Sequence, residues 1–228
     1  MTKIKLRREK AVKLKNARGR RKSSNEWLRR QLNDPYVALA RAEGLRSRAA
    51  FKIIEIDEKF KIFKKDKIVI DLGAAPGGWS QYAVSKVGDG NVIALDILEI
   101  NEIEGVHFLC QDFLDIDAKE NIMALLREKC DEAEKCDVIL SDMAPNTCGD
   151  RKTDHLRIID LLEDSLDLAM SILAKNGVFV AKIFKGGAQG ELLLKLKKNF
   201  KLIKHFKPES SRKSSAEEYL VATGFKDE

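Results

Sequence analysis

The sequence predicts an α/β protein built on a mostly parallel, doubly wound sheet. Short apolar runs rich in Val and Ile recur along the chain, at 67–71, 91–96, 106–109, 137–140 and 177–181. Helical segments separate most of these runs, and the first run ends in a glycine-rich turn. Strands that are apolar throughout, without alternation, are expected where helices cover both faces of a parallel sheet. Together these observations favour a Rossmann-like architecture.

The N-terminal segment is strongly basic. Residues 1–30 carry thirteen Lys or Arg and two Glu, a formal charge of +11, whereas the whole 228-residue chain carries +6. The rest of the chain therefore sums to −5. A cationic arm without a core pattern suits phosphate backbones, because it neutralises charge without reading sequence. We assign residues 1–22 to a flexible basic arm, with a merely solvated tail and a mitochondrial transit peptide as alternatives.

A helical preface follows the arm. The SSNE run at 23–26 has the spacing of a helix capping box, so we expect order to begin there. Apolar residues interrupted by Pro35 continue to Gly44 and predict one or two short helices. A further helix is expected at about 47–60. We expect residues 23–62 to form this preface and residues 23–226 to form a single domain.

The later elements follow from periodicity and loop length. Helices are expected at 80–87 and at 155–173, where apolar residues recur at helical spacing. Near the C-terminus, 200–206 and 217–223 are predicted to be two strands with only a short loop between them. That loop is too short for a helical crossover, so the two strands should be antiparallel.

Composition excludes several classes of protein. The sequence has no apolar stretch near the roughly 18 residues that a membrane span requires. Its four cysteines form no C-x-x-C pair and have no histidine at zinc spacing. Aromatic residues make up 7% of the chain, which gives no sign of a base-stacking platform. We therefore expect a soluble, cytoplasmic, monomeric protein that binds neither a membrane nor a metal.

The glycine-rich turn, DLGAAPGGW at 71–79, is a candidate cofactor site because it lies at the carboxyl edge of the predicted sheet, where ligands bind. It lacks the G-x-G-x-x-G spacing of dinucleotide binders. Asp71, Asp96 and Asp112 follow successive strands. Three such acceptors suit the ammonium, ribose diol and adenine amino group of S-adenosylmethionine, although for any one of them alone a helix cap or a surface turn is the commoner role.

Four motifs extend this interpretation: LRSRAAFK at 45–52, DLGAAPGGWSQ at 71–81, SDMAPN at 141–146, and SSR at 210–212 followed by Glu217. In these motifs the chain resembles the FtsJ/RlmE family of bacterial 23S ribosomal RNA uridine 2′-O-methyltransferases, over about 23–224. The resemblance implies a methyltransferase fold and S-adenosylmethionine as cofactor. The cofactor positions that it implies are Gly77, Trp79, Asp96, Asp112 and Asp142. The turn itself adds Asp71, Gly73, Pro76 and Gly78.

Lys182 is unusual because it interrupts the apolar run VFVAKIF at 178–184. A lysine is costly to bury unless it is paired, so from the residues alone it is either functional or an edge side chain that reaches solvent. The Lys-Asp-Lys-Glu tetrad of the family corresponds to Lys52, Asp142, Lys182 and Glu217. The resemblance implies that Lys182 accepts a proton from a ribose 2′-hydroxyl, while the other three set its charge and orientation.

By the same resemblance, the substrate is a uridine in the A-loop of 23S rRNA within the large ribosomal subunit, and its methylation supports late subunit assembly. A transfer RNA 2′-O-methyltransferase is the alternative within this chemistry. A non-catalytic ribosome-assembly factor is the alternative outside it, and the intact tetrad argues against that. Arg46 and Arg48, close to Lys52 in sequence, are candidates for RNA phosphate contacts or are ordinary surface arginines.

Overall fold

The computed structural model describes Val12, Gly19 and residues 21–129, 134–145, 148–185 and 190–227. Most of the predicted basic arm lies outside these residues. The helices are α1 (Lys22–Leu32), α2 (Pro35–Ala42), α3 (Ala50–Phe60), α4 (Gly78–Val87), α5 (Ala118–Lys129), α6 (Arg151–Ile172) and α7 (Gly190–Asn199). The strands are β1 (Val69–Leu72), β2 (Val92–Asp96), β3 (Val106–Cys110), β4 (Cys136–Ser141), β5 (Leu173–Phe184), β6 (Phe200–Phe206) and β7 (Glu217–Phe225).

Within the described part of the chain, the strands form one seven-stranded sheet in the order β3-β2-β1-β4-β5-β7-β6. The first five strands pair in parallel, whereas β7 runs antiparallel to both of its neighbours, β5 and β6. The predicted α/β class and the antiparallel C-terminal pair are confirmed. Strand order reverses between β1 and β4, and in doubly wound sheets this switch point is where ligands bind, beyond the carboxyl ends of the strands.

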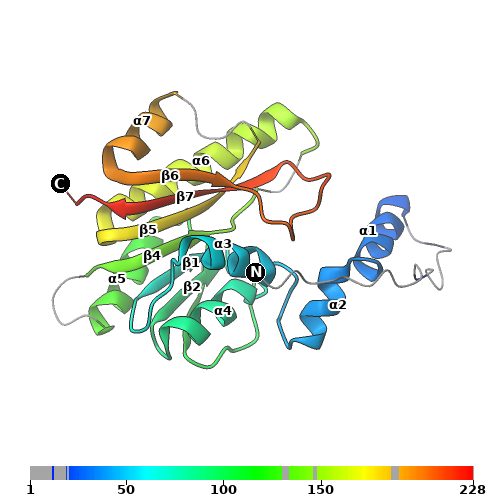
Figure 1. Cartoon of the computed structure of the whole chain (residues 1–228), viewed down its shortest axis with the longest axis horizontal. Helices are drawn as coiled ribbons and strands as arrows, with labels where there is room; N and C mark the ends of the chain where they lie inside the picture. Colours follow the sequence, from blue (N-terminus) through cyan, green and yellow to red (C-terminus); the bar gives the residue numbers. More distant parts are fainter. Residues whose placement is uncertain are drawn as a thin grey trace.

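Helices cover both faces of the sheet, with α3 and α4 on one side and α5, α6 and α7 on the other (Figure 1). In β1, Ile70 and Leu72 pack into the cluster formed with α5, α6 and α7. Val69 packs into the opposite cluster with α3 and α4. All four residues of β1 are buried, which explains why its sequence is apolar without alternation.

The helical preface departs from the expected capping pattern. Helix α1 begins at Lys22, and its N-cap residue Arg21 makes no side-chain capping bond, so the predicted capping box at 23–26 is wrong. The capping that does occur is one helix later, where the Asp34 carboxylate accepts a hydrogen bond from the Tyr36 amide at 3.1 Å and Pro35 occupies the first turn of α2. Helices α1 and α2 extend away from the sheet (Figure 1).

The described residues carry neither a membrane-spanning helix nor a metal-binding cluster. None of the helices there combines the length and the hydropathy needed to cross a membrane. The same residues contain no group of three or more His, Cys, Asp or Glu side chains that could hold a metal ion.

Candidate active site

The glycine-rich turn between β1 and α4 contains a cis Ala75–Pro76 bond and two glycines with positive φ, Gly73 at 75° and Gly77 at 95°. A Cβ on Gly73 would lie 2.8 Å from Met143, and one on Gly77 would lie 2.7 Å from Ile103. A Cβ on Gly78 would lie 2.7 Å from the hydroxyl of Ser47. Each glycine therefore also allows close packing of protein atoms against the turn, and close approach of a ligand to these glycines stays a prediction.

A cavity of about 790 Å³ opens at the carboxyl edge of the sheet. Its walls come from the loops that follow β1, β2, β3 and β4, from α6 and from the end of β5. Five of the predicted site residues line it: Gly73, Asp96, Asp112, Asp142 and Lys182. The others are not among its lining residues: Lys52, Asp71, Pro76, Gly77, Gly78, Trp79 and Glu217.

Backbone amides hold two of the lining carboxylates in place. Asp96 accepts hydrogen bonds from the amide of Ala75 at 2.8 Å and from the amide of Leu98 at 2.9 Å, one on each oxygen. Asp112 accepts one from the amide of Leu114 at 3.0 Å. Because a carboxylate oxygen has two lone pairs, both side chains keep acceptor capacity for a ligand in the cavity.

Asp71 lies beneath the turn and has no exposed surface. The hydroxyl of Ser80 donates to its Oδ2 at 2.6 Å. Burial, helped by the nearby carboxylates of Asp142 and Asp96 and opposed by the Ser80 hydrogen bond, raises the pKa of Asp71 to about 7. Because Asp71 has no exposed surface and does not line the cavity, we expect it to support the turn from below, in place of the direct ligand contact predicted from the sequence.

Trp79, which the resemblance alone singles out, is also buried. Its indole Nε1 donates to the carbonyl of Ala49 at 2.9 Å, and its ring centroid lies 5.5 Å from that of Tyr219. The side chain of Trp79 therefore joins α4 to the start of α3 and to β7, which is a packing role. A role in cofactor binding stays a prediction.

The four predicted catalytic residues converge from four segments of the chain. Lys182 Nζ lies 2.9 Å from Asp142 Oδ1 and donates to the main-chain carbonyl of Asp142 at 2.5 Å. Lys52 Nζ lies 3.8 Å from Asp142 Oδ2 and 3.6 Å from Glu217 Oε2. Both lysines are only 7% exposed. Lys182 is thus paired and buried at the cavity wall, not an edge residue that reaches solvent.

A fifth residue, Tyr219, belongs to this cluster and was not predicted. Its hydroxyl donates to Asp142 Oδ1 at 2.6 Å, and its ring lies 5.6 Å from Lys52 Nζ. Tyr219 lies directly opposite Lys182 in the β5–β7 pair. Residues two apart on a strand share a face, so Glu217 and Tyr219 point to the same side of β7. That two-residue spacing was the signal in the sequence that could have added Tyr219 to the site. It is informative only once the β5–β7 register is known, because the register places Tyr219 opposite Lys182.

The charges around Asp142 favour its ionised form. Burial alone would raise the pKa of this carboxyl, but the ammonium groups of Lys182 and Lys52 and the hydrogen bond from Tyr219 more than offset burial, so its pKa lies below the ordinary value. Burial, together with the Asp142 carboxylate, raises the pKa of Tyr219 well above 10. At neutral pH the site therefore presents a carboxylate, a neutral phenol and two buried lysines.

A family model described as FtsJ-like methyltransferase matches residues 45–225. The chain belongs to this family. It is 52% identical to the Ribosomal RNA large subunit methyltransferase E of Azorhizobium caulinodans, over 94% of this chain and 89% of the relative. It is also 52% identical to the protein of the same name from Rickettsia bellii, over 94% of this chain and 95% of the relative.

Among solved structures, the FtsJ-like chain is similar to a crystal structure from Plasmodium falciparum described as that of a ribosomal RNA methyltransferase. The TM-score is 0.68 at 30% identity, and the match covers 79% of this chain and 98% of that one. The Rossmann-like methyltransferase fold predicted from the sequence is thereby confirmed.

Two arginines near Lys52 serve the architecture of this FtsJ-like domain. Arg46 donates through its guanidinium to the carbonyls of Asn101 and Glu102. Arg48 pairs with Asp34 at 2.9 Å and donates to the carbonyl of Ser210. Both side chains are already engaged with protein groups, so the structure does not favour phosphate binding as their main role.

Proposed function

We propose that this methyltransferase transfers a methyl group from S-adenosylmethionine to the 2′-hydroxyl of a uridine in the A-loop of 23S rRNA, within the large ribosomal subunit. In this proposal it acts in the cytoplasm as a monomer and supports late subunit assembly. The observation that carries the proposal is the convergence of Lys52, Asp142, Lys182 and Glu217, since two of the four, Asp142 and Lys182, line a cavity rimmed by strand-end carboxylates. The names of the relatives support the choice of ribosomal RNA.

The cavity suits S-adenosylmethionine in size and in donor set. Its volume of about 790 Å³ lies in the usual range for small-molecule sites. Asp96, at the end of β2, would hold the ribose diol of the cofactor, and Asp112, after β3, would hold its adenine amino group. When bound, S-adenosylmethionine supplies an electrophilic methyl group. No cradle for a pyrophosphate is needed, in keeping with a turn that lacks the dinucleotide-binding spacing.

The tetrad supplies the acid–base chemistry. The ribose 2′-oxygen gains the methyl group and loses its proton, which passes to Lys182 Nζ. A lysine accepts a proton only in its neutral form, so this step requires Lys182 as the free amine. Asp142 orients this amine through its carboxylate and its main-chain carbonyl, while Lys52 links Asp142 to Glu217. A positioned base contributes roughly 10²–10⁴-fold to the rate, in addition to the gain from alignment.

Lys182 variants test this function. Lys182→Ala should lower methyl transfer to large subunits by at least about 10²-fold and leave S-adenosylmethionine affinity unchanged. Because removal of one partner of a buried ion pair can destabilise the fold, Lys182→Arg provides a second variant. It keeps the positive charge beside Asp142, but a guanidinium cannot act as a base. Exposed Lys185, three residues along, provides a matched control as Lys185→Ala.

The results separate the candidate functions. Loss of transfer in both Lys182 variants, with Lys185→Ala active, supports the proposal. Substantial activity in either Lys182 variant would show that this residue is not the base. Transfer by the wild type to transfer RNA but not to large subunits would favour the alternative substrate, and an absence of turnover would favour an assembly factor.

A further inference from the structure

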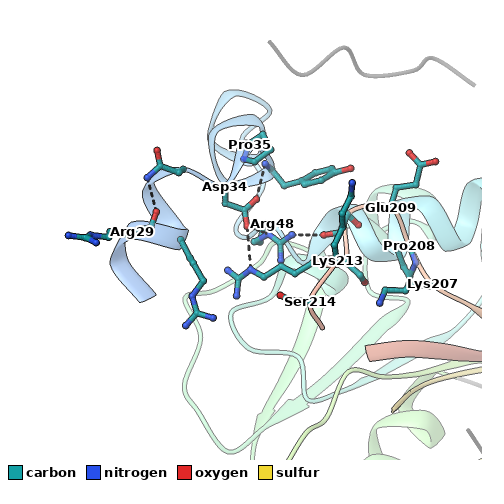
Figure 2. Close-up of a pocket in the computed structure, with 15 residues that line it drawn as sticks. Arg29, Asp34, Pro35, Arg48, Lys207, Pro208, Glu209, Lys213 and Ser214 are labelled. Atoms are coloured by element: carbon teal, nitrogen blue, oxygen red, sulfur yellow. Dashed lines mark hydrogen bonds and ion pairs between the residues drawn. The ribbon is translucent and has the colours of Figure 1, made fainter. Parts of the chain in front are cut away.

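A second pocket, of about 1060 Å³, lies between the helical preface and the loop that joins β6 to β7 (Figure 2). No tetrad residue lines it. Its walls are formed by α1, the start of α2, Arg48 just before α3, and the β6–β7 loop. The lining residues on which the argument depends are Asp34, Tyr36, Arg48, Ser210, Ser211 and Lys213.

The pocket is cationic. Among the described residues that line it, six are Lys or Arg and two are acidic. Asp34, one of the two acids, is already engaged by Arg48 at 2.9 Å and by Arg212 at 3.6 Å. Lys213 is exposed and makes no ion pair with any described residue. The lining therefore retains positive charge that the protein itself does not neutralise.

Two buried hydroxyls in the wall lack partners. Ser210 is 1% exposed and Ser211 is 4% exposed, and the Oγ atom of each makes no hydrogen bond within the described part of the chain. A buried hydroxyl without a partner is unfavourable, so such groups in native proteins call for an explanation. Both serines line the pocket, so an anion bound there is the nearest candidate for the missing acceptor.

The loop that carries these serines is held in place from the other side. The Glu55 carboxylate of α3 accepts hydrogen bonds from the amides of Glu209 and Ser210, the latter at 2.9 Å. Arg48 lies between Asp34 and the loop and donates to the carbonyl of Ser210 (Figure 2). The amides of Glu209 and Ser210 and the carbonyl of Ser210 therefore have partners, whereas the hydroxyls of Ser210 and Ser211 have none within the described residues.

Tyr36 is the one aromatic ring among the described lining residues. The guanidinium carbon of Arg48 lies 5.8 Å from its centroid. Cationic side chains beside an aromatic ring are typical of sites that bind single-stranded nucleic acid, where phosphates meet the cations and a base packs against the ring. The ring beside the cations favours an RNA strand over a free phosphate ion as the ligand, because only the strand has a base that can pack against Tyr36.

We propose that this pocket binds a nucleotide of the RNA strand next to the methylated ribose, with its phosphate at Ser210, Ser211 and Lys213 and its base against Tyr36. The assignment rests on the proposed function. The two sites share structural elements, because Arg48 precedes Lys52 by about one helical turn and the β6–β7 loop leads directly into Glu217. A strand held in the pocket would be anchored beside the tetrad.

The serines give the sharpest test. In the full-length protein, Ser210→Ala combined with Ser211→Ala should weaken binding of a short, fluorescently labelled single-stranded RNA by about tenfold for each hydrogen bond to the phosphate that is lost, or about 10²-fold together. The melting temperature of the free protein should stay the same or rise, because unpaired hydroxyls are removed. Ser85→Ala, at an exposed serine of α4, is the control. Unchanged RNA affinity overturns the proposal, and so does a lower melting temperature, which would mark the serines as structural.

A second test uses charge. Lys213→Gln should reduce the slope of log affinity against log salt by about 0.7, the value for one phosphate contact on a single strand. Lys198→Gln is the matched control, since this exposed lysine lies in the last turn of α7, at the far end of the molecule from α1 (Figure 1). An equal slope in both variants contradicts the assignment. Displacement of the RNA by millimolar inorganic phosphate alone would show an anion site without preference for RNA.

These measurements are independent of methyl transfer. If the serine and Lys213 variants lose RNA affinity while the wild type transfers no methyl group to ribose, the pocket assignment stands and the proposed function fails. If methyl transfer occurs at ribose and the variants bind RNA with the affinity of the wild type, the proposed function stands and the pocket assignment fails.

Discussion

The buried carboxyl of Asp71 makes the stability of this protein depend on pH in a direction opposite to that of most aspartates. Its pKa is raised from 3.8 to about 7, mainly because the ionised form is cut off from solvent. Between these two values the folded state holds a proton that the unfolded state has released. The free energy of unfolding therefore falls as pH rises through this window, and it levels off above about pH 7.

The expected size follows from the shift. A change of about three pKa units corresponds to about 4 kcal/mol over the full window, of which about 2.5 kcal/mol is lost between pH 5 and 8. Asp142 does not contribute to the pH dependence of the free energy of unfolding in this range. Its pKa is lowered, so the stability that its ionised form provides is lost only under more acidic conditions. Asp71→Asn removes the titration, and the asparagine carbonyl can still accept the hydrogen bond from Ser80.

Urea unfolding at several pH values, with the wild type, Asp71→Asn and exposed Asp115→Asn compared in parallel, measures the effect. The difference between wild type and Asp71→Asn should change by about 2.5 kcal/mol from pH 5 to 8, and Asp115→Asn should follow the wild type. Parallel curves for wild type and Asp71→Asn would show that Asp71 does not titrate with a raised pKa in the folded protein. S-adenosylmethionine affinity should change less than threefold in Asp71→Asn, whereas a direct contact to the cofactor ammonium would cost about tenfold or more.

Three further predictions concern the tetrad and the arm. Tyr219→Phe removes a hydrogen bond to the Asp142 carboxylate and should slow single-turnover methyl transfer. It should also lower the free energy of unfolding, measured in urea, by about 1.5–3 kcal/mol. A variant with the wild-type rate and the wild-type stability contradicts this role of Tyr219. Glu217→Gln should have a smaller effect on transfer than Lys182→Ala, because Glu217 contacts Lys52 at 3.6 Å and not Lys182; equal losses would place Glu217 closer to the chemistry. Deletion of residues 1–22 should weaken RNA binding and reduce its salt dependence without changing cofactor affinity. Unchanged RNA affinity at moderate salt would show that the arm does not contribute to RNA binding.

Much of the fold could be predicted because burial on both faces leaves a clear mark on the sequence. Val69 and Ile70 are adjacent, pack into opposite clusters and are both fully buried, so an apolar run without alternation is the direct consequence. The antiparallel pairing of β6 and β7 follows equally directly from the short loop between them. The prediction of a capping box at 23–26 was wrong because a capping motif requires its serine to lie at the N-cap position. Helix α1 begins at Lys22, before the serines.

The site was less accessible to sequence reasoning, since its chemistry depends on contacts between distant segments. The resemblance named the tetrad, but only the β5–β7 register puts Tyr219 opposite Lys182. Asp71, Asp96 and Asp112 look alike as strand-end carboxylates, yet two line the cavity and the third is sealed beneath the turn. Arg48 resembles a phosphate ligand in sequence and instead bridges Asp34 and the main chain of the β6–β7 loop.

The most direct test of the central claim is to map the transferred methyl group. Large subunits that lack the modification are incubated with the protein and methyl-labelled S-adenosylmethionine, and the RNA is then hydrolysed in alkali. A 2′-O-methyl group blocks cleavage at its own phosphodiester, so the account predicts one labelled, alkali-resistant dinucleotide from the A-loop of 23S rRNA, absent with Lys182→Arg. Label on a base, or label that persists at the ribose with Lys182→Arg, would contradict it.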